Sequence, residues 1–438
     1  MNPQDTNGTL KRQLEALQAE HRQVLSSTSY RLGRLLTRAA RSPAALFRLP
    51  RDVLRIARES WQTRRPPRLN SDDCRTICNN WDELAYQIRK NGTQQVVFLF
   101  SGTTHIQDTR GNRPIRQTQA LLARGVPVFF SYHRSRHDEL PSSDVKGLVQ
   151  SPVDVTMQIL DRIAESDLGE ARKLFIISYP YPGIEKAIRL FRKEGWIVVY
   201  DCRDDWEEFA KVGMARWFDA KVEREIVAET DRTFCVSMPL VEKMRGLVPR
   251  SFVEIMPNAV EADFLPDSYQ RTPQSSPRII GYFGHLSSAW FDWEAVSEIA
   301  RNRPQYRFEV IGHSAPALSL PENVVLLGPK PWQELHHHCA RWSVAIIPFR
   351  MGALADGVDP IKIYEYLALG HPVVSFRMPQ ISNYPYTQTV ETIADFCVAL
   401  DKATEVIPER KIIDAFLARN TWEVRASELL SVLGTPVR

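Results

Sequence analysis

Cysteine is scarce in this 438-residue sequence, and the six cysteines that occur do not cluster. Cys74 and Cys78 have the spacing of one helix face, but no second pair of cysteine or histidine residues at metal-ligand spacing joins them. This distribution is not that of a disulfide framework, and it indicates free thiols in a reducing compartment. We therefore expect a cytoplasmic protein.

Three other signals are also missing. No apolar run reaches the roughly 18 residues that a membrane-spanning helix needs, and no signal-peptide pattern occurs. There is no Asp-x-Asp tripeptide either, so the sequence offers no obvious clamp for a metal bound to a diphosphate. We expect metal-independent chemistry with no cofactor. The run His336, His337 and His338 falls in an expected helix, where neighbours point in different directions, so a solvated helix face explains it better than a metal site.

Composition sets the number of domains. With 43% hydrophobic and 25% charged residues, the chain can hold two full domains and an appendage. The appendage is residues 1–70, which carry 14 Lys and Arg against 5 Asp and Glu, whereas the rest of the chain carries 42 against 47. We expect this basic end to be a separate helical unit.

Two patterns within residues 1–70 suggest partners. Leu10, Leu14, Leu17 and Val24 follow the four-then-three spacing of a short coiled-coil helix that could pair with a second copy. Apolar residues then recur among regularly spaced arginines, which is the composition of an amphipathic helix on an anionic membrane. Arginine-rich arms bind nucleic acid too, but aromatic residues are sparse here and no nucleic-acid-binding fold follows. We favour membrane or partner contact over nucleic acid.

The C-terminal half contains five short apolar runs that are mostly separated by helical segments. Such runs are typical of a parallel sheet buried on both faces, whose ligands bind at the carboxyl ends of the strands. Gly284 and Gly312 each end one of these runs, and a glycine turn before a helix lets the backbone approach a phosphate closely. The runs are residues 278–284, 306–312, 323–328, 343–349 and 371–376.

Residues 359–374 run from a loop through a helix into an apolar strand. Pro360 suits the first position of a helix, and Asp359 before it is a favoured N-cap. Lys362 then lies in the first turn, a poor place for a cation unless an anion docks there. Glu365 lies on the same face and can accept two hydroxyl hydrogen bonds. A solvated ion pair is the commoner explanation of this spacing, but the whole segment suits the ribose and diphosphate of a nucleotide.

Taken together, these motifs resemble the donor domain of GT-B glycosyltransferases, close to the large retaining family four and to its teichuronic-acid-type and GumK-like relatives. Order and spacing agree across the whole stretch, which is more specific than any one motif. The matching motifs are GYFG (281–284), FEVIG (308–312), NVVLLG (323–328), PWQEL (331–335), AIIPF (345–349) and PIKIYEYLALGHPVVS (360–375).

The resemblance implies roles for individual residues. Glu365 would bind the ribose hydroxyls, Lys362 the diphosphate, and the backbone around Gly284 and His285 the phosphate region. The loop after Gly328 would bracket the base. The nucleotide-sugar site predicted in this way also includes Gly312, Lys330, Arg350 and Asp359.

One position departs from the family pattern. Relatives carry a second glutamate eight residues before the ribose-binding one, and this sequence has Gly357 there. Asp356 and Asp359 are the candidates to replace that carboxylate.

The N-terminal half predicts a second α/β unit, from apolar runs at 94–100, 126–132, 174–180, 196–201 and 233–237. Residues 110–125 resemble the helix after the active-site loop of the relatives. We therefore expect the GT-B architecture, with two Rossmann-like domains facing each other across a cleft. The expected parts are an acceptor domain at 71–266, a linker at 267–277, a donor domain at 278–408, and residues 409–438, whose helix at 416–430 would fold back on the acceptor domain.

An acceptor hydroxyl needs a base, and three residues of the first domain are candidates. Asp204 and Asp205 follow an expected strand, but such a pair can equally cap the next helix. His105 follows the first strand, although a loop histidine is more often a surface residue.

From these motifs and the resemblance, we expect a glycosyltransferase that moves a sugar from a nucleotide sugar to a glycan acceptor in the synthesis of a surface polysaccharide. The acceptor would be lipid-linked, and the protein would be peripheral to the inner face of the cytoplasmic membrane. Two alternatives remain: a sugar-nucleotide epimerase on the same fold, and a catalytically silent module whose N-terminal helices recruit partners.

Overall fold

The computed structural model describes residues 71–106, 112–134, 140–141, 145–266, 269–273 and 276–434. The predicted coiled coil and membrane helix of residues 1–70 lie outside these ranges. Among the helices described, none is both long and apolar enough to span a membrane.

Seven parallel strands form the sheet of the N-terminal domain, in the order β3-β2-β1-β4-β5-β6-β7. Its centre is almost wholly apolar, with Phe98 stacked on Phe175 at 4.5 Å between ring centroids. The strands are β1 (Gln95–Phe100), β2 (Val128–Tyr132), β3 (Leu148–Pro152), β4 (Arg172–Ile177), β5 (Trp196–Cys202), β6 (Arg232–Cys235) and β7 (Val253–Ile255).

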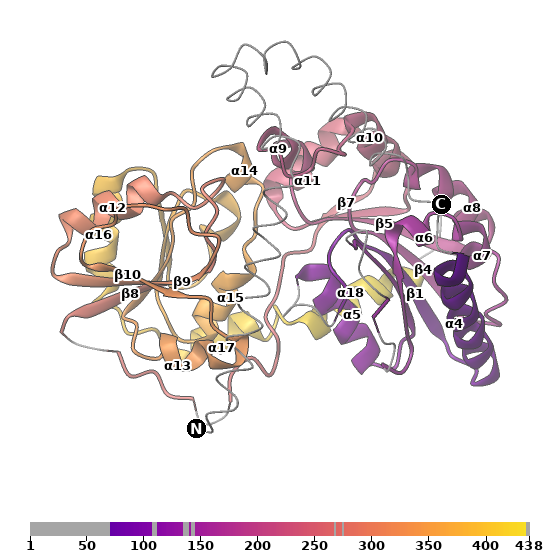
Figure 1. The fold of residues 1–438 in the computed structure, drawn as a ribbon, viewed down its shortest axis with the longest axis horizontal. Coiled ribbons are helices and arrows are strands. Elements are labelled where there is room, and N and C mark those ends of the chain that lie inside the picture. The colour runs from indigo at the N-terminus through magenta and orange to yellow at the C-terminus, as the bar shows by residue number, and fades with distance from the viewer. Residues whose placement is uncertain are drawn as a thin grey trace, which may run out of the picture. The chain divides into compact units, whose positions relative to one another are not determined.

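The helix before β1 and the helices between the strands pack on both faces of the sheet (Figure 1). This is the arrangement expected when each parallel strand returns through a crossover. They are α4 (Ser71–Lys90), α5 (Arg113–Ala123), α6 (Val153–Thr156), α7 (Leu160–Ala164), η1 (Ile184–Ala187), α8 (Ile188–Lys193), α9 (Trp206–Lys211), α10 (Ala220–Glu229) and α11 (Met238–Leu247).

Six parallel strands form the sheet of the C-terminal domain, in the order β10-β9-β8-β11-β12-β13. The order reverses between β8 and β11, and ligands of such sheets bind beside that point. The strands are β8 (Arg278–His285), β9 (Tyr306–His313), β10 (Val324–Gly328), β11 (Val344–Ile347), β12 (Val373–Phe376) and β13 (Thr387–Val390).

The helices that follow β8 along the chain include the one that carries Lys362. They are α12 (Trp293–Asn302), η2 (Trp332–Glu334), α13 (Leu335–Cys339), α14 (Ala353–Asp356), α15 (Ile361–Ala368), η3 (Pro379–Ile381), α16 (Ile393–Ala403), α17 (Arg410–Leu417), α18 (Trp422–Ser431) and η4 (Val432–Gly434).

Every strand predicted from an apolar run is present, but β3, β7 and β13 were not predicted. All three lie at sheet edges. LVQSP, VEI and TQTV each hold only one or two of Leu, Ile and Val, so they carry too little apolar signal to be recognised.

The C-terminal helix differs from its prediction at residues 416–430. The predicted helix is interrupted after α17, which ends at Leu417. A new helix, α18, begins at Trp422, because the Thr421 hydroxyl accepts a hydrogen bond from the N–H of Val424 at 3.3 Å. The apolar face of α18 packs beside α5 of the N-terminal domain, where Trp422 and Leu429 join one buried cluster with Ile115 (Figure 1).

Candidate functional site

A cavity of about 230 Å³ lies between the carboxyl ends of the two sheets. Arg203 and Asp204, which follow β5, form its N-terminal-domain wall together with Phe209 of α9. The C-terminal-domain wall is formed mainly by His285, Trp290, Phe349, Arg350, Leu354 and Lys362. The cavity therefore combines a carboxylate, several cations and aromatic rings, which are the side chains that fix the orientation of a polar ligand.

Lys362 reaches the cavity from the first turn of α15. Its Nζ lies 4.8 Å from the ring centroid of Phe349 and 5.5 Å from that of Tyr282. A Cβ atom placed on Gly284 would lie 2.9 Å from Cε of Lys362, and Gly284 has a φ of +149°. Only glycine allows this approach of the lysine to the end of β8.

His285 and Arg350 are held by the loop after β8. The Nδ1 atom of His285 accepts a hydrogen bond from the N–H of Ser287 at 3.3 Å, and the indole N–H of Trp290 donates to the carbonyl of His285. The N–H of Arg350 donates to the carbonyl of Trp290 at 2.6 Å, and its Nε to that of Ser288 at 3.1 Å. Burial, His313 and Lys362 lower the pKa of His285, so the neutral imidazole is favoured.

Asp204 and Asp205 have different roles in the structure. Burial raises the pKa of Asp204 to about 6, while the positive charges of Arg203 and Arg113 act in the opposite direction. Asp205 instead caps α9, accepting a hydrogen bond from the N–H of Glu208 at 3.1 Å and an ion pair from Lys243 at 2.7 Å. Asp204 is thus the carboxylate available to a ligand, and Asp205 serves the helix end.

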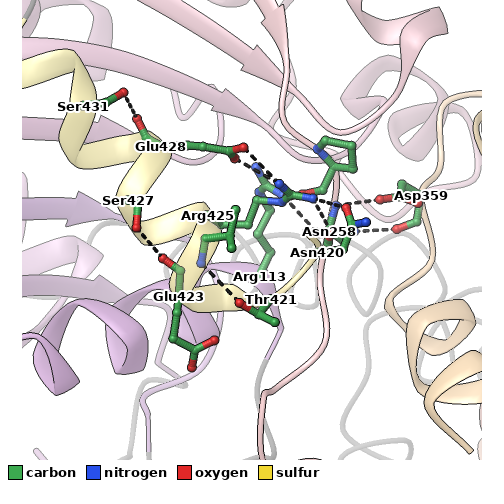
Figure 2. Close-up of polar contacts among 12 residues, drawn as sticks. Arg113, Asn258, Asp359, Asn420, Thr421, Glu423, Arg425, Ser427, Glu428 and Ser431 are labelled. Carbon is green, nitrogen blue, oxygen red and sulfur yellow. Dashed lines mark hydrogen bonds and ion pairs between the residues drawn. The ribbon is translucent and has the colours of Figure 1, made fainter. Parts of the chain in front are cut away.

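Two buried arginines fix the segment that links the two sheets, as Figure 2 shows. Arg113 donates to both carboxylate oxygens of Asp201, to the carbonyl of Pro257, and to the side-chain oxygen of Asn258. Arg425 of α18 donates to the carbonyls of Pro257 and Asn258. Helices α5 and α18, which lie far apart in the sequence, therefore hold the same two residues.

Asp359 meets this segment from the C-terminal domain (Figure 2). Its carboxylate accepts hydrogen bonds from the N–H of Asn258 at 2.6 Å and from the hydroxyls of Tyr364 and Tyr384 at 2.9 and 3.1 Å. The predicted N-cap role is wrong, because these donors occupy the carboxylate and Pro360 stands at the cap position of α15 with no side-chain cap. Burial raises the pKa of Asp359 to about 6.

The position of the missing glutamate lies against the other domain. A Cβ atom on Gly357 would lie 3.2 Å from Cβ of Asp205, and the Ser237 hydroxyl donates to the carbonyl of Gly357 at 2.8 Å. A long side chain would not fit here without displacement. Of the two candidate replacements, Asp359 lines the cavity, whereas Asp356 pairs with Arg377 at 3.0 Å.

The other predicted site residues lie outside the walls of this cavity. Glu365 is 3% exposed on α15. Gly312 allows β9 to approach β8, since a Cβ there would overlap the carbonyl of Gly284. Lys330 is half-buried near His338, and the ring of His105 packs edge-on against Tyr132 at 5.7 Å.

Sequence reasoning missed several residues of the cavity. Arg203 directly precedes Asp204 and Asp205, the two predicted candidates for the base. Trp290 and Phe209 lie in loop or helix segments without a motif. The ring centroids of Phe209 and Trp290 lie 6.2 Å apart across the two domains. Nothing in the spacing of either residue predicts that contact. No group of three or more His, Cys, Asp or Glu side chains in the described part of the chain is arranged to hold a metal ion.

Two Rossmann-like domains with a ligand-sized cavity between their carboxyl edges define the GT-B class of fold. Solved structures agree. The chain aligns with OtsA without ligand (TM-score 0.54, 13% identity, 79% of this chain and 100% of that one). It also aligns with WaaG, described as a glycosyltransferase involved in lipopolysaccharide biosynthesis (TM-score 0.53, 13% identity, 78% and 100%). Identities this low establish the fold alone.

Sequence comparison identifies the C-terminal domain more closely. Residues 277–403 match the family model for glycosyl transferases group 1. A protein of Bacillus subtilis (strain 168), TuaH, named as a glycosyltransferase of teichuronic acid biosynthesis, is 26% identical over 251 residues. That match covers 51% of this chain and 62% of TuaH, so the chain spans less than two thirds of the relative's length. The resemblance inferred from the motifs is confirmed: the chain has the GT-B fold, and residues 277–403 match the model of the group 1 glycosyl transferases.

Proposed function

We propose that this protein transfers a sugar from a nucleotide sugar to a hydroxyl of a glycan acceptor in the synthesis of a cell-surface polysaccharide. The observation that carries the proposal is the pairing of cavity walls, with Asp204 on one and Lys362, His285 and Arg350 on the other. The family of residues 277–403 and the name of the Bacillus subtilis relative support the same reaction class.

The chemistry needs opposite charges at its two ends. Negative charge builds on the departing nucleoside diphosphate, and Lys362 and Arg350 stabilise it together with the first N–H groups of α15. The anomeric carbon becomes cationic at the same time. Asp204 accepts the proton of the attacking hydroxyl. A base with a pKa of about 6 is largely ionised at neutral pH and still accepts a proton readily.

A binding screen tests the donor half of the proposal. Purified protein is melted with UDP-, GDP-, dTDP- and CMP-sugars, with and without a divalent cation, because a ligand of the native state raises its stability. We expect a shift with one nucleotide class, independent of the cation. Lys362→Met should remove the shift, and Lys402→Met, at an exposed lysine of α16, should keep it.

Turnover separates the reaction from its two alternatives. A silent module would show the shift without consuming donor, and an epimerase would convert the nucleotide sugar with no acceptor present. We expect NMR of the nucleotide sugar to show slow hydrolysis at most without acceptor, and release of nucleoside diphosphate with a surface-glycan acceptor. Conversion of the sugar configuration in the absence of acceptor would contradict the proposal.

We further propose a lipid-linked acceptor and a place at the inner face of the cytoplasmic membrane, reached through residues 1–70. The excess of Lys and Arg there supports attraction to anionic lipids. Deletion of residues 1–70 should abolish sedimentation with anionic vesicles and leave the donor shift unchanged. Sedimentation of the truncated protein with those vesicles would overturn this assignment.

A further inference from the structure

Arg203 is a largely buried arginine whose hydrogen-bonding capacity is mostly unused. Its side chain is 13% exposed and lines the cavity. The Nε–H donates to the carbonyl of Ser178 at 3.3 Å, and the guanidinium lies 5.1 Å from the ring centroid of Trp206. The nearest carboxylate oxygen, on Asp204, is 3.8 Å from Nε. Within the described chain, the two terminal amino groups make no hydrogen bond or ion pair.

The other buried arginines of this region differ from Arg203. Arg113 forms a bidentate pair with Asp201 and two further hydrogen bonds, and Arg425 bonds to Glu428, Asn420 and two carbonyls. A buried guanidinium left without acceptors costs free energy. Arg203 therefore has the features of a group whose partner arrives with a ligand.

Two residues that contact Arg203 each carry a polar atom with no partner in the part of the chain that the structure describes. These groups are the hydroxyl of Ser178, which is 0% exposed, and the indole N–H of Trp206, which is 6% exposed. Ser178 supplies the carbonyl that holds Nε, and Trp206 supplies the ring beside the guanidinium. The guanidinium and the indole N–H can only donate a hydrogen bond and the hydroxyl can also donate one, so an acceptor suits each of them, and an anionic acceptor suits the arginine best.

We propose that Arg203 anchors an oxyanion subsite for the acceptor, which binds a carboxylate or a phosphate carried by the acceptor glycan. The inference rests on the proposed glycosyl transfer. Arg203 lies on the N-terminal-domain wall next to Asp204, whereas the cations for the donor diphosphate lie on the opposite wall. The planar fork of an arginine binds either oxyanion through two parallel N–H bonds. An acceptor held in this way presents its hydroxyl to Asp204.

Binding of small probes to the full-length protein tests the subsite. The probes are methyl glucuronide, glucose 1-phosphate and neutral methyl glucoside, titrated by ligand-observed NMR in the presence and absence of UDP. We expect an acidic probe to bind about 10- to 100-fold more tightly than methyl glucoside, the ratio typical of a charge-assisted pair. The tighter of the two acidic probes identifies the carboxylate or the phosphate as the natural group.

Variants assign the preference to Arg203. Arg203→Gln should remove the preference for acidic probes. Arg203→Lys should keep part of that preference, because the charge remains but the planar guanidinium does not. Arg216→Gln, at an exposed arginine of the same domain, should leave the preference unchanged. UDP affinity should stay the same in all three. Thermal melting confirms that each variant is folded.

Two outcomes would overturn the subsite. One is equal affinity of the wild type for acidic and neutral probes. The other is a loss of UDP affinity in Arg203→Gln as large as the loss for the acidic probe, which would place the guanidinium at the donor diphosphate. If no nucleotide of the screen binds while the acidic preference persists, the subsite stands and the proposed transferase activity does not.

Discussion

The two walls of the cavity are built in different ways. Lys362 of the C-terminal-domain wall, and Gly284 against which it lies, come from segments whose local sequence predicts a loop, a helix or a glycine turn. On the N-terminal-domain wall, Asp204 and Arg203 follow β5, where the local sequence fits a base and a helix cap equally well. Long-range contacts from Arg113 and Asn258 set their surroundings. One wall is thus specified by short stretches of chain, and the other by packing.

Replacement of Asp204 should have the largest effect on turnover. Asp204→Asn removes the proposed base and should lower kcat by about 10²- to 10⁴-fold. In the wild type, kcat/KM should rise with pH through about 6 as Asp204 ionises. A pH profile that is flat between 5 and 7 would contradict the role of base.

The same substitution should stabilise the folded protein. The folded-state pKa of Asp204 is raised from 3.8 to about 6, so the stability this group contributes is present at low pH and declines as pH rises from about 4 to 6. Asparagine carries no charge to desolvate. Since the side chain keeps 26% exposure, we expect a gain of about 1 to 2 kcal/mol at pH 7, measured by urea unfolding. A loss of stability would show that Asp204 is held by partners and is not simply desolvated.

Disruption of the buried pair behind the N-terminal-domain wall should cost the most stability. Arg113 and Asp201 are 2% and 0% exposed, so Arg113→Leu leaves a carboxylate buried without its main partner. The free energy of unfolding should fall by about 3 to 5 kcal/mol. Arg216→Leu, at an exposed arginine, should change it by less than about 0.5 kcal/mol. Equal effects of the two variants would show that this wall does not depend on buried packing.

Two variants of the C-terminal-domain wall should weaken nucleoside diphosphate binding to a similar extent. Lys362→Met removes a charge-assisted contact, so calorimetry should show a loss of about 1.5 to 3 kcal/mol. Gly284→Ala introduces a Cβ that meets Cε of Lys362 and should displace it. Gly246→Ala is the control, because a Cβ there meets nothing within 4 Å. Normal affinity in Gly284→Ala would show that the close approach of the lysine is not needed.

The smallest expected effect is on the free energy of unfolding of an Asp205 variant, and it tests whether Asp204 and Asp205 differ in role. Asp205→Ala removes the cap of α9 and the ion pair with Lys243, and should lower the free energy of unfolding by about 0.5 to 2 kcal/mol. Its direction is opposite to that of Asp204→Asn. Changes of the same sign in the two variants would mean that both carboxylates serve the helix end.

Much of the fold could be predicted from sequence, because a parallel strand that is buried on both faces consists of consecutive apolar residues. The central strands of both sheets follow this rule. The edge strand β10 follows it too, whereas β3, β7 and β13 do not, since each holds only one or two of Leu, Ile and Val. The break before α18 was also missed, because the cap at Thr421 is a single hydroxyl within an otherwise helical pattern.

The residues of the candidate site also fall into two groups, those that local sequence predicts and those that distant contacts decide. Lys362 and Gly284 were found because a helix start and a glycine turn are local features of the chain. Asp359 was found too, but its assigned cap role failed, since Tyr364, Tyr384 and the distant Asn258 compete for its carboxylate. A hydrogen bond between residues a hundred positions apart leaves no periodic trace in the sequence.

The sequence by itself determined the two α/β domains, the order of their central strands along the chain, and the phosphate-suited segment around Lys362, because secondary structure follows local periodicity and turn chemistry. Only the tertiary structure decided which aspartate faces the cavity, which caps a helix, and that Arg203 stands beside Asp204 with unused donors. Burial and hydrogen-bond partners fix those roles, and both depend on which distant segments the fold brings together.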